Sequence, residues 1–297
     1  MPFRAASIAD ALSDKLGTRI EEGSRREVSG GSINRAFEYR SAKGSIFVKV
    51  SSSPSAVDML QAEAAGLKAL ASAQAVRVPE VILQGRCAEG AYLALEWIQL
   101  GRPARATEAT LGEQLAWQHR CTHAQFGWDR DNTIGSTPQP NVRSESWETF
   151  FRERRLRFQL DLAGKNGADP SILERGYRLC ENVAAFFKTY RPAASLLHGD
   201  LWGGNWGSDE DGLPVMYDPA VYYGDREADI AMTRLFGGFG NAFYAAYQST
   251  WALDAGASTR VPLYNLYHVL NHFNLFGGDY LQQAASMIDR LLAEAGG

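Results

Sequence analysis

One stretch, residues 196–205, constrains the fold of this chain more than any other, together with residues 215–220 that follow it. The first stretch reads Leu-Leu-His-Gly-Asp-Leu-Trp-Gly-Gly-Asn, and the second reads Val-Met-Tyr-Asp-Pro-Ala. Asp200 and Asp218 each follow a short apolar run, and such runs are typical of buried strands. The sequence therefore predicts two carboxylates held beside a pair of strands, with the Asn205 amide between them in the chain.

The order and spacing of these residues match the catalytic loop of a kinase. In such a loop one Asp receives the proton of the substrate hydroxyl, an Asn binds magnesium, and a later Asp joins magnesium to the phosphates. Asp200, Asn205 and Asp218 fill these places, His198 leads the motif, and Gly199 stands where many kinases have Arg. The alternative is a turn in which Asp200 caps a helix, but a turn does not explain the other two residues.

The chemistry of phosphoryl transfer needs these residue types. The protein has to position two reactants and neutralise charge, so oxygen ligands for Mg²⁺ and one base beside the nucleophile are sufficient. We therefore expect ATP and Mg²⁺ as cofactors. A hydrolytic metal site made of His198, Asp200 and Asp218 is a further alternative, but it does not explain a lysine in an upstream strand.

Composition narrows the class of protein. A chain of 297 residues with 45% apolar residues can form one large domain or two modest ones, and a net charge of −4 gives no footprint for nucleic acid. Three widely spaced cysteines suggest neither a disulfide framework nor a zinc site. No stretch approaches the roughly 18 apolar residues that span a bilayer, so we expect a cytoplasmic protein without membrane partners. The oligomeric state stays open.

The N-terminal third carries the expected parts of a nucleotide-binding lobe. Residues 27–40 read as strand, turn and strand, and the turn with Gly30, Gly31 and Ser32 has the form of a loop that covers phosphates, although by itself such a run more often forms a plain hairpin turn. Lys49 lies in an alternating strand with Phe47 on its face, where its charge needs a partner.

A helix predicted over residues 56–73 supplies that partner. We choose Glu63 over Glu80 and Glu96, the alternative being that Glu63 is one more exposed helix acid. Two strands follow, over residues 80–83 and 91–98. The second ends in Glu96, Trp97 and Ile98, where a kinase has the hinge whose backbone reads adenine.

The chain is predicted to divide near residue 100, at Gly-Arg-Pro, into an N-lobe of residues 1–100 and a C-lobe of residues 101–297. The fold class is α+β, a two-lobed protein-kinase-like fold with a strand-rich N-lobe and a mainly helical C-lobe. Helices are expected over residues 107–123 and 147–162, and from Ser171 with a capping box. Asp229 is expected to cap backbone amides of the catalytic loop, which His198 also supports from behind.

Four segments carry a resemblance to a known family. They are residues 197–205, the run Asp-Pro-Ala-Val-Tyr-Tyr-Gly at 218–224, the run Leu-Phe-Gly-Gly-Phe at 235–239 and the run Leu-Tyr-Asn-Leu-Tyr at 263–267. They closely resemble the fructosamine kinase (ketosamine-3-kinase) family, from about residue 20 to the end. Aminoglycoside and choline kinases share only the shorter His-Gly-Asp motif, so Trp202 within the loop narrows the resemblance.

The resemblance implies ATP-dependent phosphorylation of the sugar 3-hydroxyl of a ketosamine, which releases the amine and so repairs glycation. Bacterial members are better matched to ribulosamine and erythrulosamine adducts than to fructosamines. Carried over by position, Asp200 is the base, Asn205 and Asp218 bind magnesium, and Lys49 with Glu63 organises the phosphates. The glycine-containing loop covers the nucleotide.

The chain departs from the family at two positions, and alternative functions have to be considered. Ser32 stands where some relatives have Cys. Asp225, which stands where many have His, is expected to contact the substrate, and the difference leaves the details of amine or sugar recognition open. Trp202 suits stacking on a sugar face or packing between lobes equally well. The rivals are an aminoglycoside or amino alcohol kinase and a catalytically silent ATP-binding scaffold, although the scaffold predicts loss of a catalytic residue.

Overall fold

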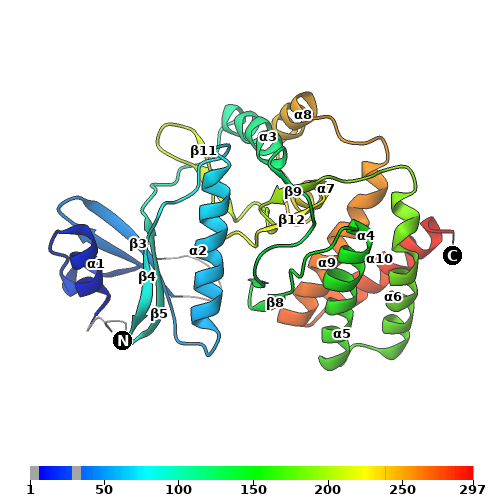
Figure 1. Cartoon of the computed structure of the whole chain (residues 1–297), viewed down its shortest axis with the longest axis horizontal. Coiled ribbons are helices and arrows are strands. Elements are labelled where there is room, and N and C mark those ends of the chain that lie inside the picture. Colours follow the sequence, from blue (N-terminus) through cyan, green and yellow to red (C-terminus); the bar gives the residue numbers. More distant parts are fainter. Residues whose placement is uncertain (1–6, 29–34, 238, 297) are drawn as a thin grey trace.

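The computed structural model describes residues 7–28, 35–237 and 239–296. A strand-rich part formed by the first third of the chain lies beside a larger helical part, and the long helix α2 (Ala56–Ser72) stands between them (Figure 1). This arrangement confirms the predicted α+β, two-lobed fold with a strand-rich N-lobe and a mainly helical C-lobe.

The N-lobe contains an antiparallel sheet in the order β1-β2-β3-β5-β4. A helix covers each face, α1 (Ile8–Leu16) on one side and α2 on the other. The strands are β1 (Arg26–Val28), β2 (Arg35–Ser41), β3 (Gly44–Ser51), β4 (Val81–Cys87) and β5 (Gly90–Glu96). A short 3₁₀ turn, Glu22–Ser24, precedes β1.

Alternation along β3 decides which residues meet which helix. Ile46, Val48 and Val50 pack in the apolar cluster that includes α1, as the period of two predicts. Phe47 packs against the other cluster, which contains the apolar side of α2. Lys49 shares the face of Phe47 and is therefore directed toward α2.

The C-lobe consists of helices with three small strand groups between them. Its longer helices are α3 (Arg105–His119), α5 (Phe158–Lys165), α6 (Pro170–Asn182), α8 (Asn241–Thr250), α9 (Ala257–Phe276) and α10 (Tyr280–Glu294). Shorter helical segments are α4 (Trp147–Phe151), the π-helical turn Arg152–Arg157, the 3₁₀ segment Val183–Phe187 and α7 (Glu227–Met232). Among the described residues no helix is long and apolar enough to cross a membrane.

The small strands carry the catalytic segments. One sheet has the order β12-β9-β6, and two hairpins pair β10 with β11 and β7 with β8. Their bounds are β6 (Thr122–His123), β7 (Asn132–Ile134), β8 (Thr137–Gln139), β9 (Ala194–Leu197), β10 (Trp206–Ser208), β11 (Pro214–Met216) and β12 (Tyr222–Gly224).

Two predicted boundaries are wrong. The helix expected over residues 107–123 ends at His119, because the chain enters β6 and pairs with β9. The expected capping box at Ser171 is replaced by Asp169, whose Oδ1 accepts a 2.8 Å hydrogen bond from the Ser171 amide, with Pro170 in the first turn. Proline suits this position because the first turn leaves its N–H groups unpaired.

The lobes share one core. Leu60, Leu67 and Leu70 of α2 belong to the same apolar cluster as C-lobe residues such as Val221. Contact is close at Gly66, where a Cβ atom would lie 3.1 Å from Cγ2 of Val221. The division at residue 100 falls in the connection between β5 and α3, but it stays a prediction because this packing crosses it.

Candidate active site

The catalytic loop follows directly from strand β9. Asp200 lies three residues beyond the last residue of this strand, and Nδ2 of Asn205 donates hydrogen bonds to its backbone oxygen at 2.8 Å and to Oδ2 at 3.1 Å. The Tyr217 amide donates to the Asn205 carbonyl at 3.0 Å. Asn205 therefore joins the loop to the chain segment that carries Asp218.

Gly199 permits this turn for two separate reasons. Its φ of +84° lies in the left-handed region, which side chains with a Cβ atom rarely adopt. A Cβ atom at this position would also lie 2.1 Å from the backbone oxygen of Ala220. The hydrogen bond of 2.8 Å from the Ala220 amide to the His198 carbonyl shows how closely the two segments approach. The Gly that replaces the usual kinase Arg is thus required by packing.

The expected support of the loop by Asp229 is confirmed. Its Oδ2 accepts a 2.7 Å hydrogen bond from the His198 amide, and its Oδ1 accepts one of 2.9 Å from the Gly199 amide. The His198 ring lies behind the loop, fully buried, with Nε2 3.0 Å from the Tyr217 carbonyl and Nδ1 3.3 Å from the Asp200 amide. Both ring nitrogens are occupied, so His198 does not suit the alternative metal site.

Lys49 of β3 reaches its predicted partner and a second carboxylate that was not predicted as a partner. Its Nζ lies 2.6 Å from Oε1 of Glu63 on α2 and also forms an ion pair with Asp218. Burial alone lowers the pKa of Lys49, but the Asp218 and Glu63 carboxylates outweigh burial and hold it above its usual value. The choice of Glu63 over Glu80 and Glu96 is therefore confirmed, and Lys49 is a cation at neutral pH.

Asp200 has the electrostatics of a base that works near neutral pH. Burial and the neighbouring negative charge of Asp218 raise the pKa of Asp200 to about 7, against a smaller opposite effect of the hydrogen bond from Asn205. A general base is most effective when its pKa lies near the working pH. Asp218 itself has a φ of +57°, a strained conformation that is found most often at functional sites.

The structure describes only some of the residues that were predicted to contact the nucleotide. Gly30, Gly31 and Ser32 lie outside the described residues. Glu96 ends β5, and its carboxylate accepts hydrogen bonds of 2.6 Å from Arg77 and 3.2 Å from the Glu80 amide. Trp97 and Ile98 follow it in the connection between the lobes, half-buried. Adenine recognition at this connection stays a prediction.

The Trp202 side chain is partly exposed and partly packed on its own loop. The side chain is 39% exposed, and its indole ring packs over Gly204, where a Cβ atom would come within 2.3 Å of the ring. The ring is therefore held by its own loop and keeps an exposed surface beside Asp200 in the chain. Stacking on a sugar stays a prediction.

Asp225 is buried too deeply to contact a substrate. The residue is 0% exposed, and its carboxylate accepts hydrogen bonds from the hydroxyls of Tyr190 and Tyr264 and from the Glu227 amide. Burial and the nearby Glu227 carboxylate raise the pKa of Asp225 to about 7. We correct the expectation of substrate recognition, because Asp225 joins three segments of the C-lobe core behind the site.

A buried amide pair that the sequence did not indicate supports the residues after Asp218. Nδ2 of Asn132 in β7 donates to the Val221 carbonyl at 2.8 Å, and Nε2 of Gln139 in β8 donates to the Ala220 carbonyl at 3.1 Å. Both lie in the connection between α3 and α4. Nothing in their spacing indicates this contact.

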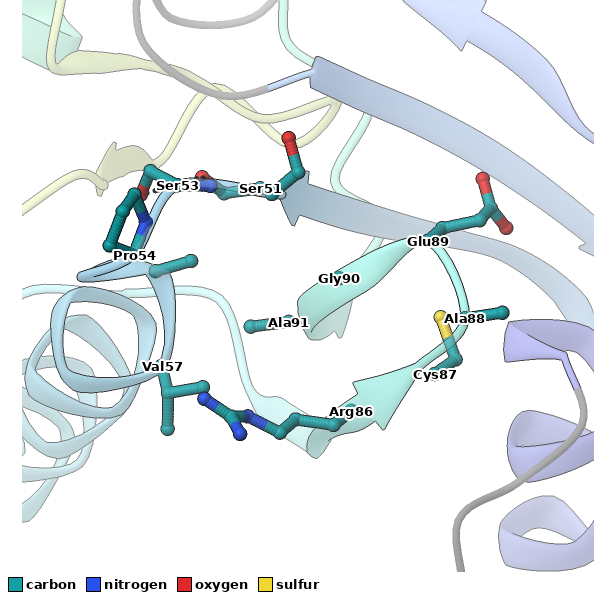
Figure 2. Close-up of a pocket in the computed structure, with 12 residues that line it drawn as sticks. Ser51, Ser53, Pro54, Val57, Arg86, Cys87, Ala88, Glu89, Gly90 and Ala91 are labelled. Carbon is teal, nitrogen blue, oxygen red and sulfur yellow. Dashed lines mark hydrogen bonds between the residues drawn. The ribbon is translucent and has the colours of Figure 1, made fainter.

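A cavity of about 310 Å³ in the N-lobe lies apart from these residues. The end of β3, the start of α2 and the β4–β5 turn surround it, and Figure 2 shows the Arg86 side chain extending toward Val57 at its edge. None of the predicted catalytic or metal-binding residues lines it. The candidate active site is therefore the catalytic loop with its Lys49 and Asp218 neighbours, between the lobes.

The fold and the site together define the class: a two-lobed phosphotransferase of the protein-kinase-like type. A profile described as "Fructosamine kinase" matches residues 4–294, nearly the whole chain. Because the match extends over more than half of the sequence, the chain belongs to the fructosamine kinase family.

Individual relatives agree. A Synechocystis sp. protein named "Probable ketoamine kinase" is 44% identical over 290 residues, which covers 96% of each chain. The Arabidopsis thaliana "Protein-ribulosamine 3-kinase, chloroplastic" is 43% identical, over 89% of this chain and 81% of the relative. A solved structure from Thermobifida fusca, described as a "putative fructosamine-3-kinase", superposes with a TM-score of 0.87 at 27% identity, covering 97% of this chain and 99% of the other.

Proposed function

We propose that this protein transfers the γ-phosphoryl group of ATP to the sugar 3-hydroxyl of ketosamines, namely ribulosamine, erythrulosamine and fructosamine adducts. The observation that carries the proposal is a site in which Asn205 contacts Asp200, Lys49 forms an ion pair with Asp218, and the charge of Asp218 acts on Asp200. The names of the relatives from Synechocystis and Arabidopsis support the substrate class.

Asp200 is the base in this proposal. As the 3-hydroxyl oxygen forms a bond to the γ-phosphorus, the bond from that phosphorus to the β,γ-bridging oxygen breaks and ADP leaves. The hydroxyl proton passes to the Asp200 carboxylate. The hydrogen bond from Nδ2 of Asn205 to Oδ2 of Asp200 fixes the direction of this carboxylate.

The donor set at Asn205 and Asp218 suits Mg²⁺. Magnesium prefers carboxylate and amide oxygens, and because the Asn205 nitrogen faces Asp200, its amide oxygen is left for a cation. Bound there, the ion would neutralise charge on the phosphates. Lys49, held by Glu63, supplies a second positive charge and orients Asp218.

The test presents Mg-ATP with ribulosamine, erythrulosamine, fructosamine and an aminoglycoside in parallel, with phosphorus NMR of the products. We expect a new sugar 3-phosphate from the ketosamines, followed by release of the amine. Phosphorylation of the aminoglycoside alone would show that the acceptor is wrong, and no phosphorylation of any acceptor would contradict the proposed activity altogether.

A further inference from the structure

A buried chain of hydrogen bonds continues from Asp229 away from the catalytic loop. Besides the amide of His198, Oδ2 of Asp229 receives Nε2 of His119, at the end of α3, at 3.2 Å. Nδ1 of His119 lies 2.8 Å from the hydroxyl of Tyr247 on α8. That hydroxyl accepts a 3.1 Å hydrogen bond from Nη1 of Arg226. We call these four residues, Arg226, Tyr247, His119 and Asp229, the buried hydrogen-bond chain.

With a neutral His119 ring, the atoms of this chain permit only one arrangement of protons. An ionised Asp229 can only accept, so Nε2 of His119 carries the single ring proton and Nδ1 is an acceptor. Tyr247 must then donate to Nδ1, which leaves its oxygen to accept from Arg226. Every hydrogen bond therefore points the same way, from the guanidinium to the carboxylate.

The environment supports this assignment. His119, Tyr247 and Asp229 are at most 1% exposed. Burial lowers the pKa of His119 and so favours its neutral ring. Burial opposes ionisation of Asp229, but the hydrogen bonds that its carboxylate accepts from His119 and from the Gly199 amide keep the pKa of Asp229 below its usual value. A buried network with every partner satisfied is rigid.

The far end of the chain is fixed to the end of α8. The Arg226 guanidinium donates to the carbonyls of Trp251 at 2.8 Å and Ala252 at 2.6 Å, and it lies 3.9 Å from the Trp251 ring centroid. Helices α3 and α8 lie side by side (Figure 1), and at Gly112 a Cβ atom would meet the Phe243 carbonyl at 2.2 Å. These contacts fix the position of Asp229 relative to α8.

We propose that His119 and Tyr247 are positioning residues for phosphoryl transfer: they fix the Asp229 carboxylate, which orients the His198 and Gly199 amides and thereby Asp200. The inference rests on the proposed function, since it assigns a role behind the proposed base. Neither side chain touches the reacting groups. Their effect should therefore fall on turnover and on the order of the catalytic loop, with little effect on nucleotide binding.

Matched variants separate positioning from general stabilisation of the fold. Tyr247→Phe removes the central hydroxyl of the chain. Tyr244→Phe is the control on the same helix, because among the described residues the Tyr244 hydroxyl forms hydrogen bonds only with Thr233, at 3.1 Å from Oγ1 and 3.3 Å from the carbonyl. His119→Leu removes the donor to Asp229, while His119→Gln retains an N–H group of similar reach.

Two readouts are taken on each folded variant at one temperature. One is kcat and KM for ATP and ribulosamine, and the other is hydrogen–deuterium exchange of peptides that cover residues 196–205. We expect Tyr247→Phe and His119→Leu to lower kcat by about tenfold or more, as loss of supporting partners commonly does, with KM for ATP nearly unchanged. Exchange in this peptide should become faster, and His119→Gln should recover part of both effects.

The outcomes are distinct. If Tyr247→Phe retains wild-type kcat and exchange, or if Tyr244→Phe changes both equally, the positioning role is overturned. If the wild-type protein phosphorylates no ketosamine, the proposed function fails, and the exchange result alone then decides whether the buried hydrogen-bond chain orders the loop. Near-ultraviolet circular dichroism identifies variants that fail to fold, for which His119→Gln provides the milder substitution.

Discussion

Nδ2 of Asn205 lies 3.1 Å from Oδ2 of Asp200, so the residue proposed to bind magnesium also orients the residue proposed to accept the proton. One short loop therefore holds the proposed magnesium ligand and the proposed base in contact. The coupling requires that the amide nitrogen face the base, which leaves the amide oxygen for the cation.

Asp200→Asn tests the role of the base. The substitution preserves the size of the side chain but removes its capacity to take a proton, so we expect kcat to fall by roughly 10²–10⁴-fold. The Kd for Mg-ATP, measured by calorimetry, should stay nearly unchanged. Asp211→Asn, on the exposed β10–β11 turn, is the control for the same chemical change. Equal loss of nucleotide affinity in Asp200→Asn would assign Asp200 to structure instead of catalysis.

Glu63→Gln tests the ion pair at Lys49. The amide cannot hold the Lys49 ammonium as the carboxylate does, so Lys49 should lean toward Asp218 and shift this metal-binding carboxylate. We expect a loss of about 10–100-fold in kcat/KM for ATP. Steady-state kinetics at varied ATP concentrations measure it. Unchanged kinetics would mean that the Asp218 contact alone positions Lys49.

Gly199→Ala tests the close approach behind the catalytic loop. The new Cβ atom meets both an unfavourable φ and the Ala220 carbonyl, so the loop has to move. Gly212→Ala is a matched control, because its φ of +80° is similar and no atom lies within 4 Å of its Cβ position. The left-handed conformation alone costs about 1–2 kcal/mol.

We expect both glycine variants to lose that amount of unfolding free energy in urea titrations, and Gly199→Ala to lose more. Only Gly199→Ala should also lower kcat. If the two variants behave alike in stability and in turnover, the contact with Ala220 has no effect beyond backbone strain.

Because the His268 side chain is buried, we expect it to make the unfolding free energy depend on pH. Burial, with the nearby His272, lowers the pKa of His268 to about 3 from an ordinary value near 6.5. The folded state therefore binds fewer protons than the unfolded state between these values. The contribution of His268 to stability is present above pH 6.5 and is lost as the pH falls toward 3.

Urea titrations of wild type and His268→Gln at several pH values measure this effect. Between these two pKa values, the unfolding free energy of the wild type should fall with decreasing pH more steeply than that of His268→Gln, by about 1.4 kcal/mol per pH unit for one proton. At pH 8 the two slopes should agree. Parallel curves throughout would show that the ring is hydrated in the folded state.

Much of the local structure and the residue types of the site could be predicted from the sequence. Alternation placed Lys49 with Phe47 on one face of its strand, the kinase pattern assigned it a glutamate of the following helix, and the position of Asp229 at the start of a helix predicted its contact with the loop amides. Periodicity, motif order and capping rules depend on neighbours in the chain and so can be recognised without the fold.

Other features could be seen only in the packing of distant elements. Asp225 lies fully buried in the core, and His119 and Tyr247, 128 residues apart, are in contact behind Asp229. The need for glycine at position 199 also became clear only from the Ala220 carbonyl. Local periodicity gives the direction of a side chain from its own element, but the group that it meets depends on how distant elements pack.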